Sequence, residues 1–371
     1  MMMFRWLVLP LLFSLAAVVY FYHKISGAVS YFFSGFSKRK RRMISGLTEV
    51  ILILPATKAF TLWFVVFLHL IVCLVLIDII AFIVKKVCKE SKNQLLWNRI
   101  YKSCIVAVLM TAIICGYGRY NIFHVVRTEY NVAANKNIRK DGYKMVVLSD
   151  LHYGISLNDS GLQKVADRID KEKADIVVLD GDIVDESTTK AQMKSAFSIL
   201  GRIKSTYGVY YVYGNHDKNN YTAEPNYSSE QLADTITKSG IKILEDETFT
   251  INNEVTLIGR ADRGSGDMQR KDIKELVKDV DKNQELIVLD HQPADYENVK
   301  NAGGDMIISG HTHAGQIWPA GLFASLFHFD ELNYGEKYVE QLHAIVTSGI
   351  AGWGVPLRTE RHSEYVVINI K

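Results

Sequence analysis

The pattern of apolar and polar positions divides the chain into two parts. Residues 1–120 consist of long apolar runs joined by basic connectors, whereas the remainder has the charge content of a soluble domain. A helix needs roughly 20 consecutive apolar residues to cross a bilayer. We therefore expect a helical transmembrane region of three or four spans over residues 1–120, a polar linker over 121–143 and a soluble domain over 144–371.

Three apolar runs in the first part have the composition of membrane spans, and they cover residues 6–22, 60–84 and 101–117. A signal peptide is the alternative for the first run, but no small-x-small cleavage site follows it closely. Residues 44–56 are apolar but carry Glu49 and Pro55, so they form either a short fourth span or a re-entrant or interfacial piece. Asp78 lies inside the second run and is expected to face other helices or water.

The basic residues indicate how these spans are oriented. Lys24 and the basic block 38–42 precede the span at 60–84, and five further Lys and Arg residues follow it. Both connectors have a cytoplasmic composition. They can lie on the same side only if residues 44–60 bring the chain back across the membrane as a fourth span, which places the soluble domain outside. With three spans the domain lies inside. We take the first arrangement as the expectation: a multi-pass protein of the cell membrane with an extracytoplasmic domain.

Composition excludes some classes of function. The net charge is only +3, and the basic excess lies beside the apolar runs, which suits a membrane surface better than nucleic acid. We therefore expect no nucleic-acid partner. The four cysteines all lie in or beside the apolar runs, so no disulfide framework is indicated.

The second part has the pattern of a mixed α/β domain. Short apolar runs alternate with helical patterns at first, and pairs of strands follow later. Strands are predicted at 144–148, 176–179, 209–213, 241–244, 248–251, 255–258, 286–289, 306–308, 342–346 and 365–370. Helices are predicted at 162–171, 190–203, 228–238 and 273–280.

Carboxylate, imidazole and amide groups follow five of these strands, where open α/β sheets keep their ligands. The candidate metal ligands are Asp150, His152, Asp182, Asn215, His291, His311 and His313. Mixed nitrogen and oxygen ligands without thiolate suit Mn, Fe, Zn, Co or Ni and disfavour Ca and Mg. Seven ligands exceed the need of one open catalytic ion, so two ions are expected. A bridging carboxylate would let them share one hydroxide.

The order of these motifs resembles the calcineurin-like metallophosphoesterase superfamily, and in particular its bacterial membrane-associated branch. The resemblance to the superfamily covers residues 144–371 and rests on Asp150-x-His152, Gly181-Asp182-x-x-Asp185, Gly214-Asn215-His216-Asp217, His291 and Gly310-His311-x-His313. The resemblance to the branch rests on Ser149-Asp150-Leu151-His152, Asp290-His291-Gln292-Pro293 and the tail 348–354. It implies a four-layer α/β/β/α sandwich, with two sheets packed face to face and helices outside. It also implies a metal-dependent phosphoric ester hydrolase, such as a phosphodiesterase, with manganese among the candidate metals.

The resemblance also implies roles for single residues. Asp150, His152 and His313 would hold one metal, and Asn215, His291 and His311 would hold the other, with Asp182 between them. His216 would stabilise or protonate the leaving oxygen, unless it is simply held by neighbouring backbone. Asp185 would orient a metal ligand and Asp217 would orient His216, although either could be a solvated loop acid. Arg358 would clamp a phosphate or lie on the surface.

The expected function is therefore that of a membrane-anchored dimetal phosphoesterase. The alternatives are a membrane sensor or scaffold that binds metal or phosphate without turnover, and a transporter. A sensor would be expected to lack a ligand, and all seven are present. Residues 317–329 are almost wholly apolar and aromatic, so they either dip into the headgroup region of a membrane, line an acyl channel, or cap the core of the domain. We expect the substrate to be a phospholipid or a lipid-linked pyrophosphate.

Overall fold

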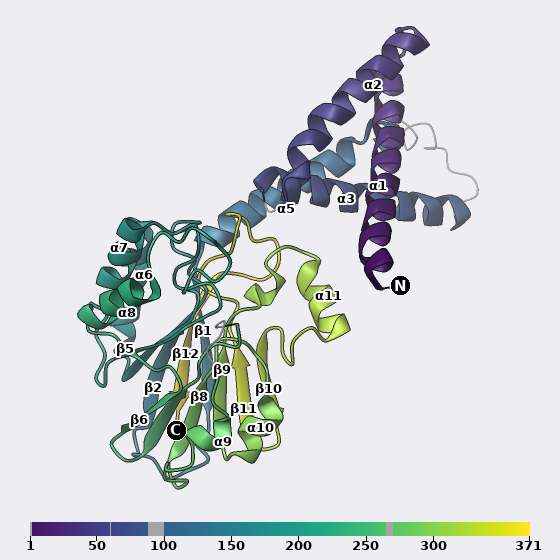
Figure 1. The fold of residues 1–371 in the computed structure, drawn as a ribbon. Coiled ribbons are helices and arrows are strands. Elements are labelled where there is room, and N and C mark those ends of the chain that lie inside the picture. The colour runs from purple at the N-terminus through teal and green to yellow at the C-terminus, as the bar shows by residue number, and fades with distance from the viewer. Residues whose placement is uncertain (1, 60, 88–99, 265–269) are drawn as a thin grey trace. The chain divides into compact units, whose positions relative to one another are not determined.

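The computed structural model describes residues 2–59, 61–87, 100–264 and 270–371 (Figure 1). The chain divides into two compact units, Met1–Tyr117 and Gly118–Lys371. Helix α5 begins in the first unit and ends in the second. The helical elements up to that point are α1 (Met2–Phe32), α2 (Lys38–Ile53), the 3-10 turn η1 (Leu54–Thr57), α3 (Leu62–Val87) and α5 (Ile105–Phe123).

Two helices in the described ranges are long and apolar enough to cross a membrane, Leu62–Lys86 and Ile105–Phe123. They correspond to the spans predicted at 60–84 and 101–117, although residue 60 and the basic connector at 88–99 lie outside the described residues. Helix α1 covers the span predicted at 6–22, but the side chains before residue 15 also lie outside them. Helix α2 begins with the basic block, so its apolar part is shorter than a bilayer requires.

Asp78 lies on α3 and is paired within the first unit, as the sequence predicted. Its carboxylate accepts hydrogen bonds from the hydroxyls of Tyr20, at 2.9 Å, and Tyr101, at 2.8 Å, and forms an ion pair with Lys24. A carboxylate among apolar helices is stable only when such partners are present. The residue therefore holds three helical segments of this unit together.

The described part of the second unit contains two six-stranded sheets. In order across the first sheet, the strands are β1 (Val126–Val132), β12 (Glu364–Ile370), β2 (Tyr143–Leu148), β3 (Ile176–Asp180), β4 (Val209–Val212) and β5 (Lys242–Ile243). In order across the second, they are β10 (Gly335–Val339), β11 (Leu342–Val346), β9 (Met306–Ser309), β8 (Glu285–Leu289), β7 (Val255–Gly259) and β6 (Glu247–Ile251).

Alternate residues of the central strands face two different apolar layers. On β2, Val146 and Leu148 pack against helices outside the first sheet, whereas Met145 and Val147 pack between the sheets. A third cluster lies between the second sheet and its own helices. The helices of this unit are α6 (Asp159–Glu172), α7 (Lys190–Leu200), α8 (Ser229–Lys238), α9 (Ile273–Leu276), α10 (Tyr296–Asn301) and α11 (Ala320–Phe327). The four-layer α/β/β/α sandwich is thus confirmed.

The segment 121–143 differs from the expected linker. Its first residues complete α5, and β1 then pairs in parallel with β12 along its whole length. Burial alternates along β1, because one face of this edge strand is covered and the other is open. The polar residues of the open face gave the segment the composition of a linker. The second unit therefore begins near Gly118 instead of at residue 144.

Candidate metal centre

The seven candidate ligands follow the carboxyl ends of five strands. Strands β2, β3 and β4 are parallel neighbours in one sheet, and β8 and β9 are parallel neighbours in the other. Parallel neighbours end at the same edge, so their following loops converge. The residues are Asp150 and His152 after β2, Asp182 after β3, Asn215 after β4, His291 after β8, and His311 and His313 after β9.

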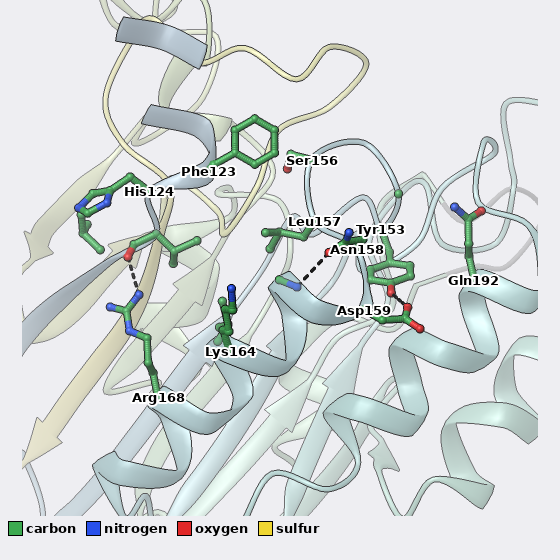
Figure 2. Close-up of a pocket in the computed structure, with 15 residues that line it drawn as sticks. Phe123, His124, Tyr153, Ser156, Leu157, Asn158, Asp159, Lys164, Arg168 and Gln192 are labelled. Atoms are coloured by element: carbon green, nitrogen blue, oxygen red, sulfur yellow. Dashed lines mark hydrogen bonds between the residues drawn. The ribbon is translucent and has the colours of Figure 1, made fainter. Parts of the chain in front are cut away.

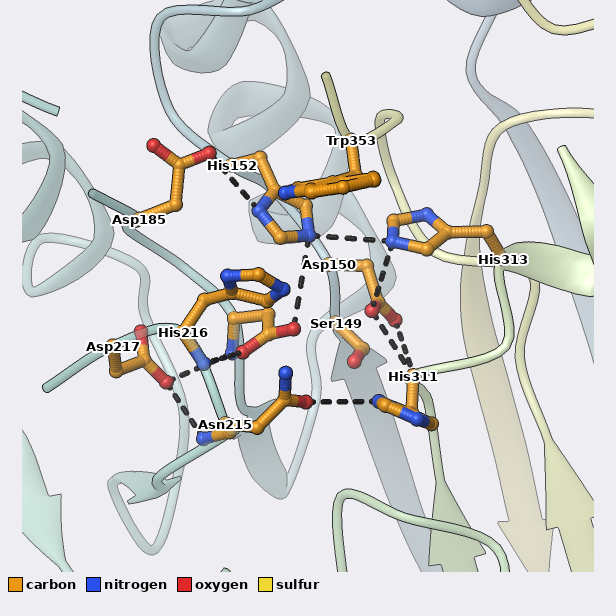
Figure 3. Close-up of polar contacts among 12 residues, drawn as sticks. Ser149, Asp150, His152, Asp185, Asn215, His216, Asp217, His311, His313 and Trp353 are labelled. Atoms are coloured by element: carbon orange, nitrogen blue, oxygen red, sulfur yellow. Dashed lines mark hydrogen bonds and ion pairs between the residues drawn. The ribbon is translucent and has the colours of Figure 1, made fainter. Parts of the chain in front are cut away.

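Three of these residues form one group. The ligand atoms of Asp150, His152 and His313 all lie within 4.8 Å of one another. Nε2 of His152 lies 3.2 Å from Nε2 of His313, which in turn lies 3.5 Å from Oδ1 of Asp150 (Figure 3). Nδ1 of His152 faces the carboxylate of Asp185 at 3.2 Å. That nitrogen therefore donates its proton to Asp185, which leaves the lone pair on Nε2 directed into the group.

Asp182, His291 and His311 form a second group with the same spacing. Oδ2 of Asp182 lies 3.1 Å from Nε2 of His291 and 3.7 Å from Nε2 of His152 in the first group. Asp182 is therefore within reach of both groups. Asn215 joins the second group, because its Oδ1 lies 2.9 Å from Nδ1 of His311 (Figure 3).

The backbone at these positions is unusual. Five of the seven have a positive φ: Asp150 at 55°, His152 at 39°, Asp182 at 52°, His311 at 70° and His313 at 49°. Such values are uncommon outside glycine, and clusters of them are found at functional sites. Neighbouring glycines provide the necessary space. A Cβ on Gly214 would overlap the carboxylate of Asp182, and a Cβ on Gly181 would meet the ring of His291.

The donor set fits two cations. Nδ1 of His291 lies 2.7 Å from the backbone oxygen of Asp180, so it carries the proton, and Nε2 is buried without a hydrogen-bond partner among the described residues. Burial lowers the pKa of His291, but the carboxylates of Asp182 and Asp150 outweigh burial and raise this pKa well above its usual value. A site that attracts a proton this strongly also suits a metal ion, which takes the proton's place.

The expected role of Asp217 is wrong. Its carboxylate accepts hydrogen bonds from the backbone amides of Asp182, at 2.8 Å, and Gly214, at 2.7 Å, and from the two amides after Asp182. It does not contact the ring of His216 in the contacts that the structure describes. Asp217 instead joins the turn after β3 to the turn after β4, and so sets the separation of Asp182 and Asn215 (Figure 3).

Arg358 also differs from both expected roles, since it neither lies on the surface nor faces the site as a phosphate clamp. Its side chain is fully buried, and burial lowers its pKa to about 10. The guanidinium donates to the backbone oxygens of His313, at 2.8 Å, and Ser348, at 2.9 Å, and to that of Ala351. It therefore holds the turn that carries His313 against the loop after β11.

His216 lies beside the second group and has an acidic partner. Its backbone amide donates to Oδ1 of Asp182 at 2.9 Å, and its Nδ1 lies 2.9 Å from the carboxylate of Glu186. Burial lowers the pKa of His216, but the hydrogen bond to Glu186 and the charge of Asp182 outweigh it and raise this pKa. The ring can therefore hold a proton beside the candidate metal ligands.

Three residues around His216 were not singled out from the sequence as parts of the site. Glu186 has a weak sequence signal, its place directly after Asp185 in the loop that follows β3. The ring of Trp353 lies 5.6 Å from the imidazole of His216 (Figure 3), and the ring of Tyr221 lies 4.9 Å from it. Tyr221 follows His216 by five residues in the loop after β4, whereas Trp353 approaches from the distant loop after β11, which no local pattern predicts.

Comparison with known proteins agrees with this geometry. The sequence model of the calcineurin-like phosphoesterase family matches residues 143–315, which include all seven candidate ligands. An uncharacterized metallophosphoesterase of Helicobacter pylori is 30% identical over 230 residues, 61% of this chain and 59% of the relative. The chain thus spans less than two thirds of the length of this relative.

Two further relatives are more distant. A transmembrane protein with metallophosphoesterase domain from Danio rerio is 28% identical over 297 residues, 76% of this chain and 66% of the relative. The UDP-2,3-diacylglucosamine pyrophosphatase LpxG of Chlamydia trachomatis is 22% identical over 259 residues, 58% of this chain and 77% of the relative. With the matched motifs and the two-sheet fold, these likenesses show that the chain carries a calcineurin-like metallophosphoesterase domain.

Proposed function

We propose that the protein is a membrane-anchored dimetal phosphoesterase that hydrolyses a phosphate ester or pyrophosphate. One observation carries this proposal: Asp182 lies within reach of both groups of candidate ligands, 3.1 Å from Nε2 of His291 and 3.7 Å from Nε2 of His152. A carboxylate in that position can join two cations at the short separation used in phosphoryl transfer.

In this proposal the ligands divide as the two groups do. Asp150, His152 and His313 would hold one cation, Asn215, His291 and His311 would hold the other, and Asp182 would be available to both. When bound, two divalent ions lower the pKa of water and neutralise charge on the phosphoryl group. The nitrogen and oxygen donors favour Mn, Fe, Zn, Co or Ni.

The remaining residues position groups and move a proton. Asp185 orients His152, and Asp217 sets the spacing of the two turns. His216 holds a proton on its ring beside Asp182 and gives it to the leaving oxygen. Glu186 keeps that proton in place through its hydrogen bond to Nδ1. The rings of Tyr221 and Trp353 lie beside the imidazole.

We further propose a lipid-linked phosphate or pyrophosphate as the substrate, taken at the membrane surface. Helix α5 passes from the first unit directly into the second, so the site stays close to a bilayer if α5 spans it. One relative is named for hydrolysis of UDP-2,3-diacylglucosamine, a nucleotide-linked lipid. The proposed location is a multi-pass position in the cell membrane with an extracytoplasmic site.

The test combines metal removal with a carboxylate substitution. Purified full-length protein is assayed on phosphomonoesters, phosphodiesters and pyrophosphates before and after chelation, with metal restored afterwards. We expect chelation to abolish turnover, and Asp182→Asn to lower it by several orders of magnitude because both cations lose a ligand. Asp305→Asn is the control, since Asp305 is equally buried but contacts no candidate ligand: its carboxylate accepts from the amide of Leu286 and forms an ion pair with Lys136. Activity that survives thorough chelation would overturn the proposal.

A further inference from the structure

Helix α11 exposes a continuous apolar surface on the second unit. The exposed fractions are 57% for Leu322, 48% for Phe323, 64% for Leu326, 60% for Phe327 and 72% for Phe329. The rings of Phe323, Phe327 and Phe329 are stacked in sequence, with centroids 6.2 Å and 6.1 Å apart. A contiguous apolar surface of large side chains is costly to leave in water.

The helix is firmly attached to the unit. The backbone amide of Gly321, the one buried residue of α11, donates to the carboxylate of Glu360 at 2.8 Å. Just before the helix, the amide of Trp318 donates to the hydroxyl of Thr359 at 3.0 Å. The start of α11 is therefore fixed by hydrogen bonds to residues 359 and 360, and the helix holds its apolar side chains outward.

The segment that holds α11 also holds the end of α5. The amide of Arg358 donates to the backbone oxygen of Gly118 at 3.0 Å, and the side chain of Asn121 donates to the backbone oxygen of Arg358 at 3.1 Å. Residues 358–360 thus contact the last turns of a candidate membrane span on one side and the start of α11 on the other. The end of a candidate membrane span and the start of α11 are therefore held by one short segment of the second unit.

A second feature beside the end of α5 suits a membrane surface. A pocket of about 900 Å³ lies between residues 123–126, which end α5 and follow it, and the loop after His152 (Figure 2). The cationic side chains of Lys164 and Arg168 line it, together with the carboxylate of Asp159, the ring of His124 and apolar side chains. Lys164 forms no ion pair with any residue that the structure describes. Cationic groups next to an apolar wall are typical of sites that face anionic lipid headgroups.

We propose that α11 inserts its apolar side chains into the headgroup region of the same bilayer that α5 crosses, so that the metal centre lies against the membrane surface. His313, the last candidate ligand, precedes α11 by six residues, so a lipid held beside the helix reaches the centre without leaving the membrane surface. The inference rests on the membrane anchoring in the proposed function and does not require hydrolysis.

The experiment places a spin label on α11 in the full chain. The four natural cysteines are replaced by alanine, and single cysteines are introduced as Phe323→Cys or Leu326→Cys. The matched control is Lys278→Cys, an exposed position just beyond α9, at the opposite end of the sandwich (Figure 1). The proteins are reconstituted in vesicles of phosphatidylcholine with phosphatidylglycerol, and collisions of the label with oxygen and with a water-soluble nickel complex are measured.

We expect labels at positions 323 and 326 to collide with oxygen severalfold more often, and with nickel severalfold less often, than the label at position 278. Equal access to nickel at all positions would place α11 in water and overturn the inference. Low access to both reagents, with an immobilised label, would show that α11 is covered by protein, either the helices of the first unit or a second copy, and would overturn it too. Repeating the measurement in Asp182→Asn separates insertion from hydrolysis.

Discussion

The backbone amide of His216 contacts Asp182 of the candidate centre, and Nδ1 of its ring contacts Glu186. The other ring nitrogen is therefore left for the substrate. We predict that His216→Ala keeps both metals but lowers turnover by about 10²–10⁴-fold, the usual contribution of a general acid. The loss should be greatest for substrates with poor leaving groups. Elemental analysis beside kinetics makes the check, and loss of a metal in the variant would make His216 a ligand.

Glu186 supplies the internal control for this assignment. Its carboxylate acts on the ring of His216, so Glu186→Ala should lower turnover less than His216→Ala does. Combining the two changes should add almost nothing to the effect of His216→Ala alone. Fully additive effects would mean that Glu186 acts elsewhere in the site.

Glu285 carries a pH dependence of stability remote from the metal centre. Burial and the neighbouring charge of Asp305 raise its pKa to about 7, while the amides of Asn135 and Lys136 donate to its carboxylate at 2.9 Å and 3.0 Å. A carboxyl whose pKa is higher in the folded than in the unfolded state favours folding while it is protonated. Its contribution is therefore complete below the unfolded value near 4.5 and is lost as pH rises through about 7.

The size of this effect is on the order of 3 kcal/mol between pH 5 and pH 8. We predict that Glu285→Gln, which imitates the protonated carboxyl, removes most of that part of the pH dependence. The measurement is the thermal unfolding of the full chain at several pH values, with wild type and variant side by side. Parallel pH curves would contradict the prediction.

At the level of secondary structure, the sequence predicted the buried strands well and the exposed elements poorly. Strands β3 and β8 are continuous apolar runs because both of their faces are covered, and the candidate ligands were found because they follow such runs. Strand β1 alternates between covered and open positions and was taken for a linker. Helix α11 lacks a polar face, so no helical period marked it.

The roles of single residues in the site could be predicted only where a short motif specifies them, and not where they depend on contacts between distant segments. The ligands are specified by short motifs, and the structure brings all of them together. Arg358 instead takes its role from its hydrogen bond to the backbone of His313, and Glu186 from its contact with the ring of His216. Both partners lie in other loops of the chain. Residue type and spacing carry no information about such partners, which is why the role expected for Arg358 was wrong.

The exposure of α11 leads to a prediction about substrate choice. If Phe323 and Phe327 enter the headgroup region, Phe323→Ser/Phe327→Ser should lower hydrolysis of a lipid phosphate in vesicles by at least about tenfold, since each buried Phe is worth about 1.5–3 kcal/mol. A water-soluble headgroup analogue should be hydrolysed as before. Tyr338→Ser is the control, because Tyr338 is an exposed aromatic residue on β10. Equal effects on both substrates would contradict the proposed lipid substrate.

At the scale of the whole molecule, the number of membrane spans decides on which side of the membrane the candidate metal centre lies. Both basic connectors can be cytoplasmic only if residues 44–60, which include most of α2 and all of η1, return the chain across the bilayer. The apolar part of α2 is short for that purpose, and α2 begins with the basic block. The positive charges and the helix length therefore favour different topologies, and the two differ in the location of the second unit.

Reporter fusions after Lys58, Gln94 and Lys371 separate these topologies. We predict that a cytoplasmic reporter is active after Gln94 and that an extracytoplasmic reporter is active after Lys58 and after Lys371, because excess positive charge retains connectors in the cytoplasm. A cytoplasmic reporter active after Lys58 would show that α2 stays on one side. If the reporter after Lys371 were then also active only in the cytoplasm, the substrate would have to come from the inner leaflet, and the extracytoplasmic location would be wrong.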